Sequence, residues 1–209
     1  MTDLLVLHDL DAAGGGEWAD AFAGWPGRVF APDLPGHNRT APPEGGQYET
    51  GDAAFVALDV LRAEAPDELV VVGVGHNGAA AQILALGGRA AGLALVDGLG
   101  GPWLGPVEID AQLREMRRRI LTTPAAMSNP TVGVADPRAT MVVGAANREF
   151  AVRQAEAMPV PVLLIETPSS PTSDTDDIAG HFAEATLVRI DARDPSRAAS
   201  LVQSWWANR

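Results

Sequence analysis

The chain has 209 residues, a formal net charge of −12 and a sequence pI of about 4.6, a size that suits one domain with its own core. So acidic a chain is a poor partner for nucleic acids and anionic membranes, and we exclude both. It contains no cysteine, which excludes disulfides, thiolate nucleophiles and Cys-ligated metals, and we expect neither a metal nor a cofactor.

The first apolar run of the chain covers only Leu4–Leu7, and no basic segment precedes it. A signal peptide or a membrane span needs a longer apolar stretch. We therefore expect a soluble, cytoplasmic protein.

In the first hundred residues, short apolar runs alternate with helical patterns. The runs predict strands at Leu4–Leu7, Val29–Ala31, Leu69–Val72 and Leu93–Val96. Between them the patterns predict helices at 16–25, Asp52–Glu64 and Ala79–Leu86. Gly87 and Gly88 are expected to end the third helix, because glycine is the usual residue after a helix.

The alternation breaks between residues 98 and 158, where no strand pattern occurs. Helices are predicted there at 107–121, Pro137–Val143 and Arg148–Ala157. Strands return at Val160–Ile165 and Leu187–Ile190, separated by a polar stretch at 167–177 that we expect to be a flexible loop. A last helix, Pro195–Trp206, carries the adjacent Trp205 and Trp206, which we interpret as packing residues.

Strands that alternate with helices predict an α/β fold, with a mainly parallel sheet covered by helices on both faces. We expect residues 1–209 to form a single domain. Residues 98–158 would then be a short helical lid over the carboxyl ends of the strands, where open α/β sheets bind ligands.

A first interpretation of the site is a dinucleotide fingerprint. Gly73-Val74-Gly75-His76-Asn77-Gly78 matches G-x-G-x-x-G, and Asp97 follows about 20 residues later, where an acid would hold a ribose. However, the motif follows the third predicted strand, whereas in that fold it normally follows the first. The outsider hypothesis is therefore a dinucleotide-dependent oxidoreductase.

A second interpretation rests on four segments that occur in a fixed order: LLVLHDL, VFAPDLPGHNRT, LVVVGVGHNGAAA and GLALVDGLGGPW. Together they resemble the α/β-hydrolase superfamily over roughly the first hundred residues. That family has His-Gly after an apolar strand, then Asp-x-Pro-Gly-His-Gly, then Gly-His-Ser-x-Gly. The resemblance implies an α/β-hydrolase-like fold with a helical lid.

By this resemblance, Asn77 occupies the position of the nucleophilic serine. The nucleophile elbow requires a strained backbone at that residue and small neighbours. Gly75, Gly78 and Ala79 supply the small neighbours, and asparagine tolerates a positive φ better than most residues. A carboxamide is nevertheless a poor nucleophile, although it can donate and accept hydrogen bonds.

The other members of a Ser-His-Asp triad are also missing from their expected loops. The loop after the fifth predicted strand brings Ser169 or Ser170 to the position of the acid. The loop after the sixth contains Arg193 and Asp194, and no histidine. We therefore expect conventional ester hydrolysis by a covalent intermediate to be lost.

The resemblance implies a pocket floor made of His8, Asp9, Leu10, Asn77 and Gly78. The backbone N–H groups near Asp9 and Leu10, with that of Gly78, would form the oxyanion hole, which an inward-pointing Asp9 carboxylate would oppose. His76 belongs to the same region.

Other residues are expected around the mouth of this pocket. Asp97 and Trp103 would lie there, and His8 with Asp97 is the one pair we consider for proton transfer. His8 can equally serve to satisfy a backbone group. Four arginines of the expected lid form either a solvated face or a clamp for an anion, namely Arg114, Arg117, Arg118 and Arg119.

Two hypotheses of function follow. In the first, the pocket binds or transforms a small organic molecule without a covalent intermediate, as a lyase, isomerase, cyclase or hydratase does, with His8, Asn77 and Asp97 as catalytic candidates. In the second, the chain is a pseudo-hydrolase that serves as a non-catalytic binding module. The sequence leaves open whether the chain forms a homodimer.

Overall fold

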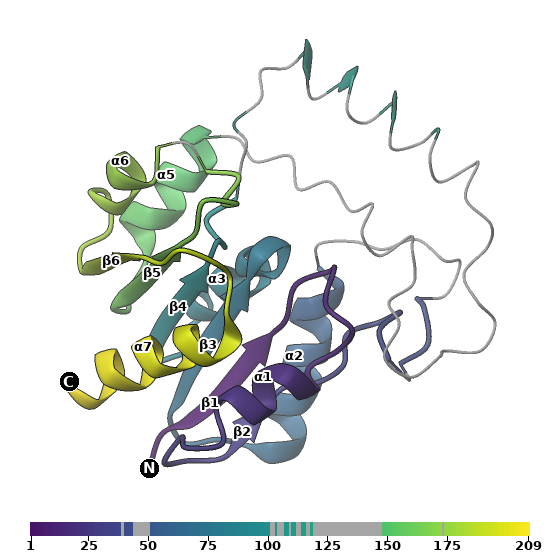
Figure 1. Ribbon diagram of the computed structural model, residues 1–209, viewed down its shortest axis with the longest axis vertical. Helices are drawn as coiled ribbons and strands as arrows, with labels where there is room; N and C mark the ends of the chain where they lie inside the picture. The colour runs from purple at the N-terminus through teal and green to yellow at the C-terminus, as the bar shows by residue number, and fades with distance from the viewer. Residues whose placement is uncertain are drawn as a thin grey trace.

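The computed structural model describes residues 1–38, 40–43, 51–100, 103, 107, 108, 110, 111, 114, 115, 118, 148–172 and 174–209. Within this part of the chain, one six-stranded sheet forms the centre of the molecule (Figure 1). Its strands are β1 (Asp3–Leu7), β2 (Val29–Phe30), β3 (Leu69–Val74), β4 (Gly92–Val96), β5 (Val162–Glu166) and β6 (Ala185–Arg189).

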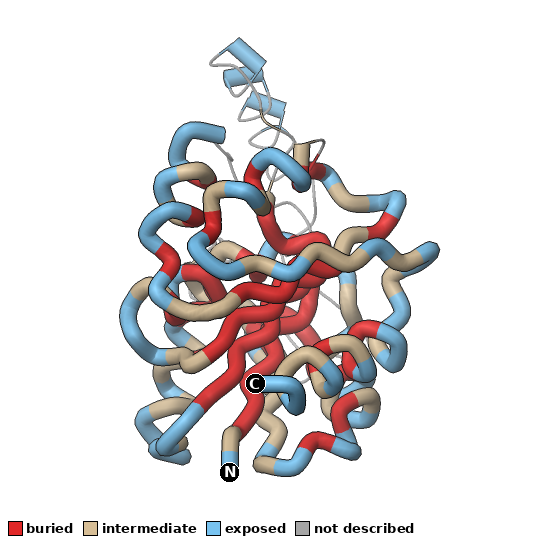
Figure 2. The backbone as a smooth tube through the Cα atoms, turned by 90° about the vertical axis from the view of Figure 1, so that its left-hand side faces the viewer, coloured by how far each residue is buried: buried red, intermediate tan, exposed pale blue. Residues whose placement is uncertain are grey.

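All neighbouring strands are parallel, in the order β2-β1-β3-β4-β5-β6. β1, β3 and β4 are buried along their whole length, as expected for parallel strands covered on both faces. Figure 2 shows these strands as buried tubes through the centre, whereas β6 at the edge is only partly buried. The predicted parallel sheet is confirmed, with strand ends within two residues of those expected.

Two hydrophobic clusters, one on each face of the sheet, hold the helices. On one face, α2 (Asp52–Glu64), α3 (Gly78–Leu86), α5 (Arg148–Ala157) and α6 (Thr175–Ala179) pack against the sheet. On the other lie α1 (Gly16–Ala21) and α7 (Pro195–Ala207). Because side chains alternate along a strand, Leu5 joins the first cluster and Leu4 the second.

α2 and α5 have the predicted bounds, and Gly87 and Gly88 end α3 as expected, Gly88 with a φ of +68°. Two predictions need correction. α1 ends at Ala21, before the predicted end, and the chain then turns so that the Trp25 indole donates to the Thr2 carbonyl. The polar stretch at 167–177 contains the start of α6, whose first turn carries Asp176 and Asp177, residues favourable at a helix N-terminus.

Most of the predicted lid lies outside the described residues. This applies to the predicted helix at Pro137–Val143 and to much of the one at 107–121, so the lid stays a prediction. Among the described residues, no helix combines the length and the apolar character needed to cross a membrane.

Candidate functional site

The loops that follow the strands bring polar side chains together at the carboxyl edge of the sheet. Asp9 follows β1, Asp97 follows β4, and Arg193 follows β6, and ion pairs join the arginine to both acids. His76 after β3 and Thr167 after β5 complete the group through Asp9 and Asp97. This is the edge where open parallel sheets bind ligands, so the polar groups gather where the fold predicts a site.

The turn after β3 differs from the predicted elbow. Asn77 has φ −79° and ψ 0°, an ordinary right-handed conformation, so the expected strain at Asn77 is wrong. The positive φ of +53° falls on Gly75, and Gly75–Asn77 form a short 3-10 turn before α3. Glycine adopts a positive φ at little cost, and the turn therefore places its unusual backbone two residues earlier.

The predicted close packing around the turn is present. A Cβ at Gly78 would lie 2.1 Å from the Gly98 carbonyl oxygen, and one at Gly73 would lie 2.6 Å from the Ala81 Cβ. Atoms cannot approach so closely without a shift of backbone. The glycines after β3 thus let α3 pass directly beside the turn that follows β4.

Asn77 is almost completely buried, and its side-chain amide donates to the His8 carbonyl. Two of the residues that the resemblance places on the pocket floor, Asn77 and His8, are therefore in contact. Because this bond joins the turn after β3 to the end of β1, it gives Asn77 a structural role.

His8 is fully buried, and both nitrogens of its ring meet backbone groups. Nε2 accepts from the Leu34 N–H at 3.2 Å, so Nδ1 carries the proton and donates to the Asp9 carbonyl at 2.8 Å. Burial lowers the pKa of His8 to about 4, and the ring is neutral near pH 7. No ring nitrogen is left for proton transfer, and the geometry favours the backbone-satisfying interpretation of His8.

The Asp9 carboxylate points into the region where an oxyanion hole was expected. Its Oδ1 accepts from the backbone N–H groups of Leu10 at 2.8 Å and His76 at 3.1 Å, and its Oδ2 pairs with Arg193 at 2.5 Å. Burial acts to raise the pKa of Asp9, but the hydrogen bonds from the His76 side chain and the Leu10 N–H, together with the charge of Arg193, outweigh it and lower the pKa to about 2. The Leu10 N–H, one of the donors expected to stabilise an oxyanion, thus already donates to the ionised Asp9 carboxylate.

Asp97 has a φ of +52°, which is unusual for a residue other than glycine, and its side chain is fully buried. Its Oδ1 accepts from the Thr167 N–H and its Oδ2 from the Thr167 hydroxyl, both at 2.8 Å. Arg193 Nε donates to the same Oδ2 at 3.1 Å. No hydrogen bond between Asp97 and His8 occurs among the described contacts, so the two candidates for proton transfer are not coupled.

Sequence reasoning missed the role of Arg193, although it placed the residue correctly. Arg193 lies in the loop where the family's histidine is expected, and its guanidinium joins Asp9 and Asp97. Its pKa is raised, because the two carboxylates outweigh the opposing effect of burial. The sequence did contain a signal for this role: the loop after β6 has an arginine, whereas the resemblance predicts a histidine there.

His76 differs from the other residues of the group because about half of its side chain is exposed. Its Nδ1 lies 3.4 Å from Asp9 Oδ1. The hydrogen bond to Asp9 raises the pKa of His76, against the opposing effect of burial. The site therefore contains one imidazole that reaches solvent.

Trp103 lies half-buried against the cluster that includes α2 and α3, and its indole N–H donates to the Asp174 carboxylate. The same carboxylate accepts from Arg148 Nε at 2.8 Å, at the start of α5. These contacts fasten the segment after β4 to the start of α6. That Trp103 lines a pocket stays a prediction.

Of the four lid arginines, Arg117 and Arg119 lie outside the described residues. Arg118 pairs with Glu115, and both side chains are more than half exposed. This pair fits a solvated face better than an anion clamp. In the described part of the chain, no group of three or more histidine and acidic residues is arranged to hold a metal ion.

Two contacts argue against a dinucleotide at the glycine motif. A Cβ on Gly75 would lie 1.9 Å from the Asp9 carboxylate, so an anion of the protein is packed against the turn where a pyrophosphate would bind. Asp97, the expected ribose ligand, is engaged with Thr167 and Arg193. Close packing and the turn conformation account for the glycines without a cofactor.

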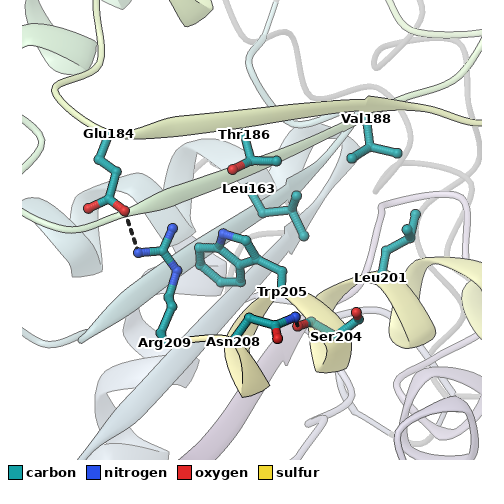
Figure 3. Close-up of a pocket in the computed structure, with 9 residues that line it drawn as sticks. All are labelled: Leu163, Glu184, Thr186, Val188, Leu201, Ser204, Trp205, Asn208 and Arg209. Carbon is teal, nitrogen blue, oxygen red and sulfur yellow. Dashed lines mark hydrogen bonds and ion pairs between the residues drawn. The ribbon is translucent and has the colours of Figure 1, made fainter.

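A separate groove of about 410 Å³ lies between β6 and the end of α7 (Figure 3). Glu184 and Arg209 close one side with an ion pair of 2.6 Å, and the guanidinium stacks over the Trp205 ring. The Trp205 indole nitrogen is buried, with no hydrogen-bond partner in the described part of the chain. Trp206 packs against Gly92 of β4, and the pair thus has the packing role predicted for it.

No family model matches the sequence, and no curated protein matches it. Solved structures do match its fold along the whole chain. An esterase from Thermogutta terrifontis is 19% identical, with 100% of this chain and 90% of that chain covered and a TM-score of 0.71. The thioesterase domain of the curacin biosynthetic pathway is 18% identical, with 100% and 91% covered and a TM-score of 0.73.

A monoacylglycerol lipase from Paleococcus ferrophilus is 14% identical, with 99% of this chain and 94% of that chain covered and a TM-score of 0.67. At such identities the likeness concerns the fold alone. The chain has an α/β-hydrolase fold, and the predicted fold class is confirmed.

Proposed function

We propose that this chain, built on an α/β-hydrolase fold, binds a small organic molecule at the carboxyl edge of its sheet and performs no covalent ester hydrolysis. The observation that carries the proposal is the ion-pair network of Asp9, Arg193 and Asp97 at the carboxyl edge of the sheet, in which Arg193 comes from the loop where the resemblance predicts a histidine. Arg193 cannot act as the base that activates a nucleophile, and it holds both carboxylates in ion pairs.

Three further features support the loss of covalent chemistry. Asn77 has no hydroxyl, and its amide is bonded to the His8 carbonyl. The Leu10 N–H donates to Asp9, and the N–H groups at the Gly78 end of the turn donate to the carbonyls of Gly75 and His76. Two of the donors expected to stabilise an oxyanion, at Leu10 and Gly78, are therefore satisfied within the protein.

A second candidate function is turnover without a covalent intermediate, of the lyase, isomerase or hydratase type. The specific observation in its favour is His76, whose half-exposed ring lies beside the buried Asp9 carboxylate. Binding alone and non-covalent turnover share the same site and differ in whether this imidazole moves a proton.

The loss of covalent chemistry is tested with a fluorophosphonate probe and p-nitrophenyl esters. Intact mass after incubation is expected to show no adduct on the wild-type protein. Asn77→Ser is expected to stay unlabelled as well, because Arg193 cannot take the serine proton and the Asn77 side chain contacts the His8 carbonyl, whereas the His76 ring faces Asp9. A serine esterase serves as the positive control. A stoichiometric adduct on the wild-type chain would overturn the proposal.

Ligand binding is tested by following the melting temperature in the presence of nucleotides, acyl esters, acyl-thioesters and small organic acids. Malate belongs in the panel because the matched esterase structure is described as malate-bound. A ligand that binds only the folded state raises its stability by mass action. We expect a shift with an uncharged or carboxylate-bearing compound, and none with NAD or NADP.

The same measurement on two variants of the protein shows where the ligand binds. Asn77→Ala is expected to reduce the shift, whereas Ser204→Ala in the groove beside α7 leaves it unchanged. If the ligand is also converted, Asn77→Ala abolishes turnover. A shift with NAD or NADP would instead favour the dinucleotide interpretation of the glycine motif.

A further inference from the structure

The four histidines of the chain differ in what their rings contact. His8 and His37 are fully buried, with both ring nitrogens on backbone groups. His181 pairs with Glu156 on the outside of the molecule. His76 combines a partly exposed ring with a buried carboxylate partner at the carboxyl edge of the sheet.

The Asp9 carboxylate holds this ring in one tautomer. An ionised carboxylate only accepts hydrogen bonds, so the His76 Nδ1 that faces Asp9 Oδ1 carries the proton. Asp9 itself is fixed by Leu10 N–H, His76 N–H and Arg193. Nε2 of the neutral ring then holds a lone pair, and no contact among the described residues uses it.

We propose that His76 acts through Nε2 as the general base of a non-covalent reaction, with Asp9 as its positioning residue. The substrate class is a neutral compound with an acidic C–H or O–H bond, as isomerases, lyases and hydratases use. This inference rests on the proposed function, because it gives a chemical role to the same site. It replaces His8 and Asp97, which are engaged elsewhere, as the group that moves a proton.

The charges around His76 are suited to this role. Asp9 and Asp11 face the ring with negative charge and favour the imidazolium that forms after proton transfer, whereas Arg193 opposes it. Because the hydrogen bond to Asp9 raises the pKa of His76, the neutral base accumulates at a higher pH than for an ordinary histidine. The rate should therefore rise with pH and level off once the ring is neutral.

The probe for this reaction is 5-nitrobenzisoxazole. A base removes its C3 proton, the electrons of that C–H bond form the nitrile, and the N–O bond breaks to release a coloured phenolate. The proton moves to His76 Nε2 and then to water, so the reaction needs no oxidant or cofactor. We expect the wild-type protein to accelerate the release, and His76→Ala to reduce the rate by about tenfold or more, below the full effect of a base on a natural substrate.

His181→Ala is the matched control and should keep the wild-type rate, because it removes a histidine far from the site. Asp9→Asn should lower the pH midpoint of the rate. The same midpoint should appear in an NMR titration of the His76 ring of the wild-type protein, a measurement that needs no folded Asp9 variant. An equal rate in wild type and His76→Ala, or two different midpoints, would overturn the inference.

The inference and the proposed function fail in different ways. If His76→Ala keeps the ligand-induced shift in melting temperature while the wild-type protein shows no elimination, the binding proposal stands and the assignment of His76 as a general base is wrong. If elimination depends on His76 but a fluorophosphonate labels the wild-type chain, the assignment of His76 as a general base stands and the proposal that covalent chemistry is lost is wrong.

Discussion

Arg193 joins two buried carboxylates at the centre of the site. Asp97 is fully buried and Asp9 is 9% exposed at the side chain, and the arginine pairs with both. Charged groups in such surroundings need their partners, because solvent cannot replace them. At the scale of single residues, the charge of each of these three groups is therefore compensated by the others.

Replacing Arg193 by methionine should destabilise the protein by about 3–5 kcal/mol, since it removes the arginine charge that pairs with both buried carboxylates. Urea unfolding followed by fluorescence measures the loss. Arg197→Met on the exposed side of α7 is the matched control and should change stability by less than about 0.5 kcal/mol. A loss below about 1 kcal/mol for Arg193→Met would show that the network is unimportant for folding.

At the scale of elements, α3 and the turn after β4 approach each other through glycines. Gly78 begins α3 and its Cα lies against the backbone of Gly98, whereas Gly16 begins α1 and faces open space. The sequence predicted small residues here because the elbow of the resembled family needs them. The shift of the positive φ from Asn77 to Gly75 was not predictable, because it depends on how Asp9 packs against the turn.

Gly78→Ala should destabilise the protein by about 1–3 kcal/mol, because the new methyl group would meet the Gly98 backbone. Gly16→Ala, also at the first residue of a helix, should be neutral or stabilising by up to about 1 kcal/mol. Thermal and urea unfolding of the two variants make the comparison. Equal effects of the two substitutions would contradict the close approach seen at α3.

At the scale of the whole molecule, stability should depend on pH through groups buried in the site. The His8 pKa is about 4 in the folded state and 6.5 in its ordinary state, so between these values the unfolded chain binds a proton that the folded chain does not. The contribution of His8 to stability is complete above pH 6.5 and is lost as the pH falls toward 4. Asp9, with a folded pKa of about 2, adds a further loss between about pH 4 and pH 2.

The free energy of unfolding should thus fall by about 3 kcal/mol between pH 6.5 and 4, as the shift of the His8 pKa implies. Urea titrations at several pH values measure it. His8→Gln should be less stable and show a flatter dependence on pH in this range, whereas His181→Gln should keep the wild-type slope. An unchanged slope in His8→Gln would assign the acid sensitivity to other groups.

The sequence by itself determined most of the elements and the parallel sheet, because hydrophobic periodicity and turn residues act locally, and the resemblance of four ordered segments predicted the α/β-hydrolase fold. It also determined that no serine stands at Asn77 and no histidine in the loop of Arg193. Only the tertiary structure decided that Asp9, Arg193 and Asp97 form one network, and that the half-exposed His76 ring lies beside it. These contacts join residues from β1, β3, β4 and β6 loops, and side-chain direction and burial become fixed only when the strands pack side by side.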